Sequence, residues 1–230
     1  DLGCGTGLLG LLACEAGAAR VYAVDGGAII ELARQIAART RFADRITHIK
    51  AMSTDVHLPE LVDVVVADQI GGLAYDAGMC HYYRDARRLL RPGGRFVPGR
   101  LTLHLAPVCS PSSYTEVSGW RDTPSGYDLA DVVGLAANNV WAVHLQPADL
   151  LAPPAVVHER ASDDDRPIEV DASVTITTAG TLHGLAGMFT AHMAPGVTMS
   201  NVCGRADQMR ERWQNFYPLH PELALEPGDV

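Results

Sequence analysis

Apolar positions change their spacing about halfway along the chain. In residues 28–41 the apolar side chains recur at helical spacing, whereas residues 61–67 form a near-continuous apolar run. Such a run is typical of a central strand in a parallel sheet that is covered on both faces. Predicted strands and helices alternate up to residue 107. This alternation predicts a doubly wound α/β domain over residues 1–107.

The element boundaries of this domain follow from apolar periodicity and from turn residues. The segment 91–94, Arg-Pro-Gly-Gly, is expected to stop the last helix, because proline and glycine disfavour its continuation. The predicted helices are 8–13, 28–41 and 75–90, and the predicted strands are 18–25, 46–51, 61–67 and 95–108.

Beyond residue 108 the spacing becomes that of short strands. Pro, Gly, Ser and Asp interrupt β-rich runs, and no alternating helices are expected. We therefore predict an all-β second domain, a sandwich or barrel, over residues 108–230. The acidic run 163–165 is expected to be a solvated turn, with a Ca²⁺ site as the alternative. The predicted strands are 141–145, 155–158, 169–177, 183–192 and 197–201.

A glycine-rich turn opens the chain. The first seven residues read Asp-Leu-Gly-Cys-Gly-Thr-Gly, and an apolar helical stretch follows them. Glycines at a strand-to-helix turn let the chain reverse tightly and let a ligand approach the backbone. Asp25 ends the next predicted strand, where a carboxylate can accept hydrogen bonds from a ribose diol. Together these features predict a nucleoside-bearing cofactor.

The glycine spacing distinguishes between nucleotide cofactors. A dinucleotide fingerprint that begins at Gly3 requires glycine at position 8, where this chain has Leu8. The spacing G-x-G-x-G, with an aspartate two residues before the first glycine, is usual in enzymes that use S-adenosylmethionine, which has no pyrophosphate. The simpler alternative is an ordinary tight turn, with Asp25 capping the next helix.

Both ends of the chain suggest a fragment. A turn of this kind normally follows a buried strand, yet Asp1 already belongs to the turn motif. Residues 227–230 read as a turn that leads toward another strand. We therefore expect that the first strand of the fold and N-terminal helices are missing, and that the second domain is truncated at its C-terminus.

Composition and charge exclude several classes of function. With 47% hydrophobic and 20% charged residues, the chain is expected to fold. No apolar run reaches the roughly 20 residues of a membrane span, and a net charge of −9 disfavours nucleic-acid binding. Without a signal-peptide pattern, we expect a cytoplasmic protein. The five cysteines form no C-x-x-C pair and no H-E-x-x-H motif occurs, so no metal is expected.

Four stretches carry a family resemblance. Residues 1–27, 62–76 and 84–98, together with Trp-Gln-Asn-Phe-Tyr-Pro-Leu at 213–219, resemble the protein arginine methyltransferase family. The resemblance implies a nucleotide-binding α/β domain followed by a β-barrel. It also implies S-adenosylmethionine as the cofactor and transfer of its methyl group to a guanidinium.

The resemblance also implies roles for individual residues. Asp25 would hold the ribose, and Ser53 and Thr54 would flank the adenine. Asp68 and Asp76 fall at the positions of two family glutamates that grip the substrate guanidinium, and they are the catalytic candidates. A guanidinium keeps its charge, so carboxylates must hold it by paired hydrogen bonds. The implied cofactor residues are Asp1, Gly3, Gly5, Gly7, Asp25, Ser53 and Thr54.

Departures from the family pattern leave the acceptor open. Both glutamates are replaced by shorter aspartates, and their loop is one residue tighter. The family's Thr-His-Trp element reads Glu-Arg-Trp at 211–213. Arg212 could act in catalysis, pair with either aspartate or lie on the surface; pairing would favour an acceptor other than arginine. Tyr75, Arg212 and Trp213 are the substrate-binding candidates, with packing as the alternative for Tyr75 and Trp213.

Alternatives also remain for the acids and for the whole chain. Asp68 could cap the following helix, and Asp76 could be an exposed residue of its first turn. The chain could methylate a small molecule or another side chain, or could be a non-catalytic relative. Residues 109–131 occupy the place of the family's dimerisation arm, which predicts a homodimer, with an ordinary connection as the alternative.

Overall fold

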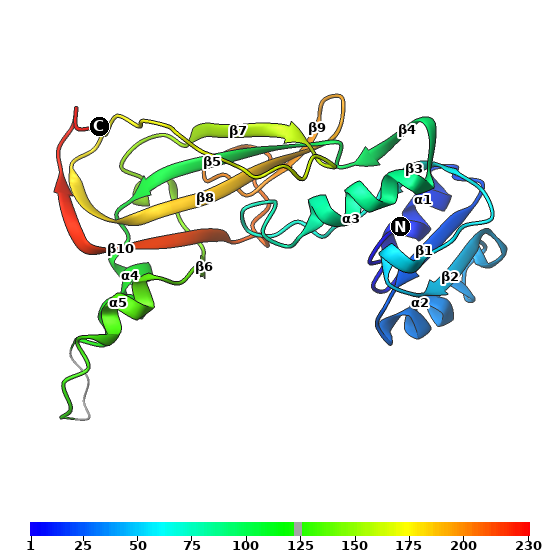
Figure 1. Ribbon diagram of the computed structural model, residues 1–230, viewed down its shortest axis with the longest axis horizontal. Helices are drawn as coiled ribbons and strands as arrows, with labels where there is room; N and C mark the ends of the chain where they lie inside the picture. Colours follow the sequence, from blue (N-terminus) through cyan, green and yellow to red (C-terminus); the bar gives the residue numbers. More distant parts are fainter. Residues whose placement is uncertain (122–125) are drawn as a thin grey trace.

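The computed structural model describes residues 1–121 and 126–230. Figure 1 shows an elongated molecule, with a parallel α/β part at the N-terminal end and long antiparallel strands at the other end. The predicted combination of an α/β domain with a β-rich domain is confirmed. Residues 122–125, which belong to the predicted dimerisation arm, lie outside the described residues.

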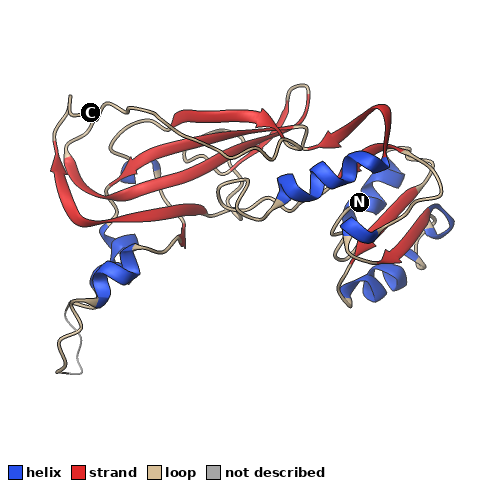
Figure 2. Cartoon of the chain, in the orientation of Figure 1, coloured by secondary structure: helices blue, strands red, loops and turns tan. Residues whose placement is uncertain are grey.

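The α/β part alternates helices and strands as predicted, with boundaries shifted by a few residues. Its helices lie beside the short parallel strands in Figure 2. Short 3₁₀ turns occur at η1 (Ala43–Arg45), η2 (Ser53–Asp55) and η3 (Arg87–Leu89). The elements are α1 (Leu8–Glu15), β1 (Val21–Asp25), α2 (Ile29–Ala37), β2 (Ile46–Lys50), β3 (Val62–Val66), α3 (Met79–Ala86) and β4 (Leu90–Val97).

The first residues of the chain join two pairs of parallel strands. β1 pairs with β2, and β3 pairs with β4. Leu2 donates its N–H to the carbonyl of Val66 at 2.9 Å, and Cys4 donates to Val24 at 2.9 Å. Residues 1–4 therefore lie between β1 and β3, and the glycine turn emerges at the carboxyl edge of both strands.

The apolar runs of the sequence form the core of this part. Ala23 and Val24 of β1 are almost fully buried, and so are Ile30 and Ala33 on the inner face of α2. Tyr83 of α3 is also fully buried, and its hydroxyl donates to the carbonyl of Val97 at 2.6 Å. Tyr83 thus packs α3 against the sheet and also joins α3 to the end of β4 by a hydrogen bond.

The predicted strand 95–108 is two strands in different sheets. The region 90–97 pairs with β3 as β4, and β5 (Arg100–Val108) pairs with antiparallel strands instead. The chain changes sheet at Pro98 and Gly99, where the Val97–Pro98 peptide is cis. The proposed division of domains at residue 107 stays a prediction.

The second sheet is antiparallel and ordered β6–β10–β8–β5–β7, with β9 pairing β8. In the described residues its end strands β6 and β7 do not pair, so the sheet is not a closed barrel. The 15-residue strand β8 is its long central strand. The strands after β5 are β6 (Trp141–Val143), β7 (Ala155–Ala161), β8 (Gly180–Ala194), β9 (Val197–Ser200) and β10 (Gln214–Leu225).

Two strand assignments in this sheet required correction. The predicted strand 169–177 is irregular; its only buried side chain is Ile176, whose N–H bonds to the carbonyl of Asp229. In contrast, β10 was not predicted, because Pro218 and Pro221 interrupt its pattern. The register of β10 against β8 shifts between Pro218 and Leu223, and this shift accommodates the prolines.

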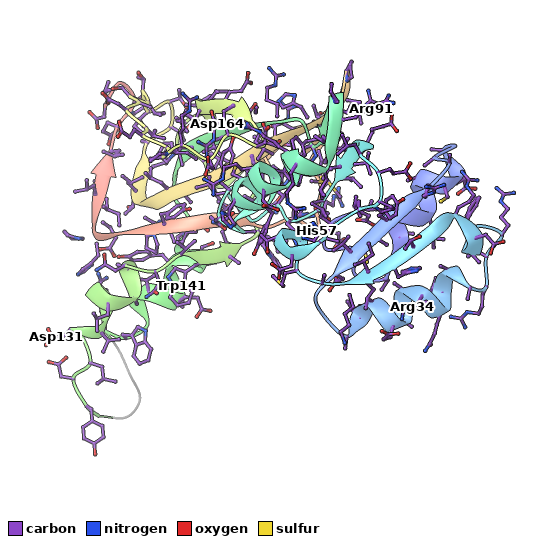
Figure 3. The ribbon with its side chains drawn as sticks, turned by 45° about the vertical axis from the view of Figure 1, so that its right-hand side comes forward. Arg34, His57, Arg91, Asp131, Trp141 and Asp164 are labelled. Atoms are coloured by element: carbon purple, nitrogen blue, oxygen red, sulfur yellow. The ribbon has the colours of Figure 1, made fainter. Side chains whose placement is uncertain are left out.

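The expectation that helices are absent after residue 108 was wrong. Helices α4 (Pro111–Ser118) and α5 (Val132–Ala137) form a segment that projects from the sheet in Figure 1. Asp131, labelled in Figure 3, lies toward its outer end. Buried Tyr114 and Val133 belong to one apolar cluster with Phe216 of β10, which holds the base of this segment on the sheet.

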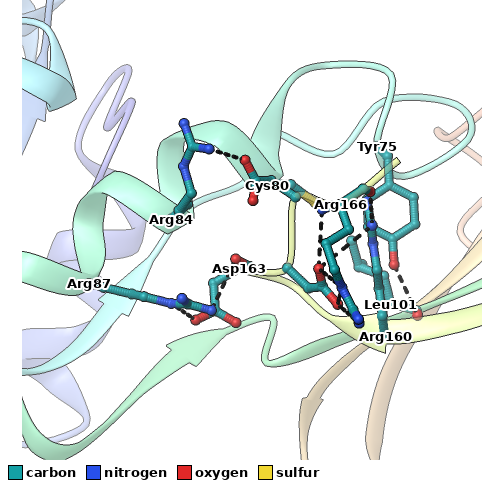
Figure 4. A network of polar contacts seen from close by, with 10 residues as sticks. Tyr75, Cys80, Arg84, Arg87, Leu101, Arg160, Asp163 and Arg166 are labelled. Atoms are coloured by element: carbon teal, nitrogen blue, oxygen red, sulfur yellow. Dashed lines mark hydrogen bonds and ion pairs between the residues drawn. The ribbon is translucent and has the colours of Figure 1, made fainter. Parts of the chain in front are cut away.

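The acidic run 163–165 is more than a solvated turn. Asp163 pairs with Arg87 and Asp165 pairs with Arg84, both arginines belonging to the region of α3 and η3. Figure 4 shows these contacts joining the turn after β7 to α3. Arg166 bonds to Asp164 at 2.6 Å and holds the pKa of that carboxyl well below its usual range. The run therefore connects the turn after β7 to α3 and η3 by ion pairs.

A buried histidine lies in the second sheet. His104 of β5 is 7% exposed, and its Nε2 lies 3.1 Å from Thr190 Oγ1. Burial, helped by the charge of Arg205, lowers the pKa of His104 to about 4. The unfolded chain therefore binds a proton at this residue between pH 6.5 and 4, whereas the folded chain does not.

We predict that His104→Gln reduces the acid destabilisation of the fold. The wild-type free energy of unfolding should fall as pH drops from 6.5 to 4, because protonation favours the unfolded state. Over the same pH range, the free energy of unfolding of the variant should fall by about 2 kcal/mol less than that of the wild type. Urea unfolding at several pH values measures this, with His57→Gln, an exposed histidine labelled in Figure 3, as the control. Equal pH dependence in both variants contradicts the prediction.

Candidate functional site

The glycine turn has the backbone geometry that its sequence predicts. Gly3, Gly5 and Gly7 all have positive φ, at 66°, 52° and 82°. A Cβ on Gly3 would lie 2.5 Å from the amide nitrogen of Gln69, whereas a Cβ on Gly5 would meet no atom within 4 Å. The turn is thus packed on one side and open at Gly5.

Asp25 is tied to this turn. Gly5 donates its N–H to Asp25 Oδ2 at 2.9 Å, and Gly27 donates to Oδ1 at 2.7 Å. Helix α2, which follows, has no side-chain cap at its N-terminus, so Asp25 is not a helix cap. An ionised carboxylate has about four acceptor positions, so two remain for a hydroxyl-bearing ligand.

Asp1 and Gln69 add unpaired acceptors beside the turn. Asp1 Oδ2 accepts from the N–H of Gly10 at 3.1 Å, which fixes the carboxylate at the start of α1. Asp1 Oδ1 and Gln69 Oε1 are buried, and no described residue donates to them. Buried acceptors normally have partners, so each of these two oxygens has an unused acceptor position. Gln69 was not predicted, because its contact with Gly3 arises only on folding.

Ser53 and Thr54 lie in η2, just after β2. Arg88 donates to the carbonyl of Ser53 at 3.1 Å and to that of Thr54 at 2.9 Å. Before them, Ala51 donates its N–H to the carbonyl of Asp25 at 3.2 Å. The structure thus brings the two residues to the same edge of the sheet as Asp25, and Arg88 fixes the backbone that carries them.

The loop after β3 carries the two candidate acids. Asp68 forms an ion pair with Arg212, which resolves the alternatives for Arg212 in favour of pairing. The other terminal nitrogen of Arg212 donates to the carbonyl of Ile70 at 2.9 Å. Arg212 therefore contacts the loop at two points, although it comes from the segment just before β10.

Asp76 is held by Asn215, the second residue of β10. Its Oδ2 accepts from the amide of Asn215 at 2.8 Å, and its Oδ1 accepts from the N–H of Leu73 at 3.1 Å. A Cβ on Gly71 would overlap Asp76, and a Cβ on Gly72 would overlap Asn215. The Gly-Gly pair therefore gives these two side chains the space that they occupy.

Neither acid takes part in capping helix α3. The N-cap is Gly78, no side chain caps it, and the first turn contains no acidic residue. Asp68 is therefore not the helix cap, and Asp76 precedes the first turn, although it is exposed as that alternative expected. Both carboxylates instead bond to side chains of residues 212–215, the segment that spans the start of β10.

A network of buried amides fixes that segment. Asn201, fully buried after β9, donates to the carbonyls of Gly72 at 2.9 Å and Trp213 at 2.7 Å. Gln214, also buried, donates to the carbonyl of Asn201 at 2.7 Å. These residues join the loop after β3 to the second sheet. Sequence reasoning missed them, because an isolated Asn or Gln carries no pattern.

Tyr75 and Trp213 differ in their surroundings. The hydroxyl of Tyr75 donates to the carbonyl of Leu101 at 3.3 Å, and the guanidinium of Arg160 lies 4.5 Å from its ring centre. Burial raises the pKa of Tyr75 to about 12. These contacts favour packing for Tyr75. Trp213 is 54% exposed, with its ring 5.4 Å from that of His144, so it is not a core residue.

Other features of the described residues do not indicate a second functional site. A cavity of about 560 Å³ lies between β1 and β3, and its lining includes Asp1, Leu2 and Gly10. The five cysteines are free thiols. In residues 1–121 and 126–230, no group of three or more potential metal-ligating side chains occurs. No helix in those residues has the length and apolar character of a membrane span.

Comparisons with known proteins agree with this geometry. Residues 1–94 match the family model described as a methyltransferase domain. The chain is 28% identical over 207 residues to the histone-arginine methyltransferase CARMER of Anopheles gambiae, covering 84% of this chain and 33% of that protein. It is 34% identical over 138 residues to the probable protein arginine N-methyltransferase 6 of Arabidopsis thaliana, covering 59% and 32%.

Solved structures show the same fold. The Trypanosoma brucei PRMT1 enzyme–prozyme heterotetrameric complex with AdoHcy superposes with a TM-score of 0.88 at 20% identity, over 99% of this chain and 74% of that one. Protein arginine methyltransferase 10 of Arabidopsis thaliana gives 0.82 at 20% identity, over 99% and 75%.

The sequence matches show a similarity to these relatives in addition to the similarity in fold. The chain spans about a third of the length of the curated relatives it matches. The chain thus contains a methyltransferase domain match over residues 1–94 and is similar in sequence and in fold to proteins named as arginine methyltransferases.

Proposed function

We propose that this protein is an S-adenosylmethionine-dependent methyltransferase that acts on an arginine guanidinium of a protein. The observation that carries the proposal is the direct contact between the glycine turn and Asp25, through Gly5, at the carboxyl edge of the parallel sheet. Ligands of open α/β sheets bind at this edge. The ion pair of Arg212 with Asp68 by itself favours another acceptor. The choice of arginine is supported by related proteins, which bear the names of arginine methyltransferases, and a solved neighbour contains AdoHcy.

The residues present fit this cofactor. Asp25 has acceptor positions for a ribose diol, and Ser53 and Thr54 lie beside it for the adenine. The buried acceptors of Asp1 and Gln69 suit the ammonium group of the methionine part. When bound, the cofactor supplies a methyl group on a sulfonium. The task of the chain is to hold the acceptor nitrogen in line with that methyl group.

The acceptor side of the site is acidic, as a cationic acceptor requires. Asp68 and Asp76 flank the Gly-Gly turn, and their carboxylates would accept hydrogen bonds from guanidinium N–H groups. Asn215 and the N–H of Leu73 keep Asp76 oriented while its remaining lone pairs stay available. A carboxylate that is fixed in this way polarises the guanidinium and orients one nitrogen toward the cofactor.

We also propose a cytoplasmic homodimer formed through residues 109–131. The projecting segment supports this, because Trp120 is 40% exposed within this range and Leu135 of the adjoining helix α5 is 70% exposed. Exposed apolar side chains on a projection are typical of interaction surfaces. Light scattering of the purified protein tests this proposal: a dimeric mass supports it, and a monomeric mass at micromolar concentration contradicts it.

We predict that Gly5→Ala abolishes cofactor binding without unfolding the protein. The new methyl group would project into the open space beside the turn, and the positive φ would add about 1–2 kcal/mol of strain. Gly93→Ala is the matched control, because Gly93 has a φ of 79° and equally open surroundings away from the site. Calorimetric titration with S-adenosylhomocysteine should show binding only to the control and the wild type. Unaltered affinity in Gly5→Ala argues against a cofactor at this turn.

We predict that Asp76→Asn lowers methyl transfer by about 10²-fold and leaves cofactor affinity unchanged. The substitution removes the negative charge but retains an oxygen for the N–H of Leu73. Transfer of labelled methyl groups to an arginine-containing peptide measures the effect. Asp44→Asn, an exposed acid in η1, should retain full activity. If Asp76→Asn retained it as well, the role of this carboxylate would be excluded.

A further inference from the structure

An arginine of the chain already occupies the acidic loop. The two terminal nitrogens of Arg212 contact different acceptors of the loop: one pairs with the Asp68 carboxylate, and the other donates to the carbonyl of Ile70 at 2.9 Å. The Arg212 side chain is 26% exposed, compared with 52% for Asp68. The guanidinium is therefore seated against the loop.

These contacts are the ones that an acceptor arginine would need. A guanidinium is recognised by a carboxylate and by carbonyl oxygens that accept from its planar set of N–H donors. Arg212 uses both kinds of acceptor and neutralises Asp68. An incoming guanidinium would meet a positive charge at this carboxylate, so the two guanidinium groups compete for one position.

The backbone at Arg212 is held by contacts that do not involve its side chain. Its N–H donates to the carbonyl of Met209 at 3.1 Å, and the carbonyl of the next residue, Trp213, accepts from buried Asn201. Asp76 is held separately by Asn215. Rotation of one side chain would thus free Asp68 while the other candidate acid stays in place.

We propose that Arg212 is a specificity-determining residue that competes internally with the acceptor guanidinium for Asp68. The proposal rests on the proposed function. An acceptor arginine binds fully only when Arg212 has turned away, so its apparent affinity is reduced by the fraction of molecules in which Asp68 is free. Once bound, the acceptor is methylated at a rate that does not depend on Arg212.

The test is a split between KM and kcat in Arg212→Met, which retains side-chain length and removes the guanidinium. If Asp68 is free in about a tenth of wild-type molecules, KM for an arginine-containing peptide should fall about tenfold in the variant. The kcat should change little. Arg205→Met is the control, because Arg205 pairs with Asp207 and not with the acidic loop. An unchanged or higher KM in Arg212→Met overturns the proposal.

Two further measurements test the proposal without relying on turnover or on the folding of Arg212→Met. Calorimetric binding of the peptide in the presence of S-adenosylhomocysteine should show the same tenfold gain without any turnover. If Arg212→Met does not fold, Arg212→Lys replaces it, because a lysine keeps the charge but cannot make the paired contacts. Its KM should lie below that of the wild type, and an equal KM would overturn the proposal.

The failure of this proposal can be told apart from failure of the proposed function. If every variant binds the cofactor and methylates the peptide with one common KM, only the role of Arg212 is wrong. If S-adenosylhomocysteine does not bind to the wild type or to the control, the proposed function fails, and the role of Arg212 fails with it.

Discussion

The site depends on the register of residues 1–4 between β1 and β3. Because Cys4 donates to Val24, the next residue, Gly5, lies beside Asp25, and the two form a hydrogen bond. Because Leu2 donates to Val66, the same turn lies next to the loop after β3. A shift of this short segment along either neighbour would separate the turn from the acid. The main chain therefore positions the cofactor side before any side chain contributes.

The acceptor side is built differently, by contacts between the two sheets. Arg212 and Asn215 reach from the segment at β10 to the acids of the loop after β3, and Asn201 holds the backbone of both. An α/β domain alone would leave the loop without these partners. The antiparallel sheet thus gives the loop its shape and sets the charge that an acceptor meets there.

The sequence predicted best what depends on short-range pattern. The glycine turn, the position of Asp25 and the apolar strand β3 follow from local spacing, and the structure contains all three. Residues 169–177 alternate like a strand but lack a partner strand, and no pattern of a single segment reveals that. In β10 the opposite occurred, because pairing with β8 overrides the two prolines.

Polar contacts between distant segments could not be predicted in this way. Arg88 bonds to the backbone of Ser53 and Thr54, and Gln69 packs on Gly3. The presence of an arginine or a glutamine at these positions in the sequence does not indicate such contacts. The acidic run shows the same limit, since its composition suits a solvent-exposed turn equally well. The family resemblance located the candidate acids, yet the partner of Arg212 required the fold.

One apolar cluster crosses the boundary between the sheets. Val65 and Tyr83 of the parallel part belong to the same buried cluster as Leu101 and Phe189 of the antiparallel part. Separating the halves between β4 and β5 would leave apolar surface in water on both fragments. A chimaera that joins this antiparallel sheet to the α/β half of a related protein would therefore need a matching set of side chains at this boundary. Exchange of whole halves between relatives is constrained by side-chain shape as well as by chemistry.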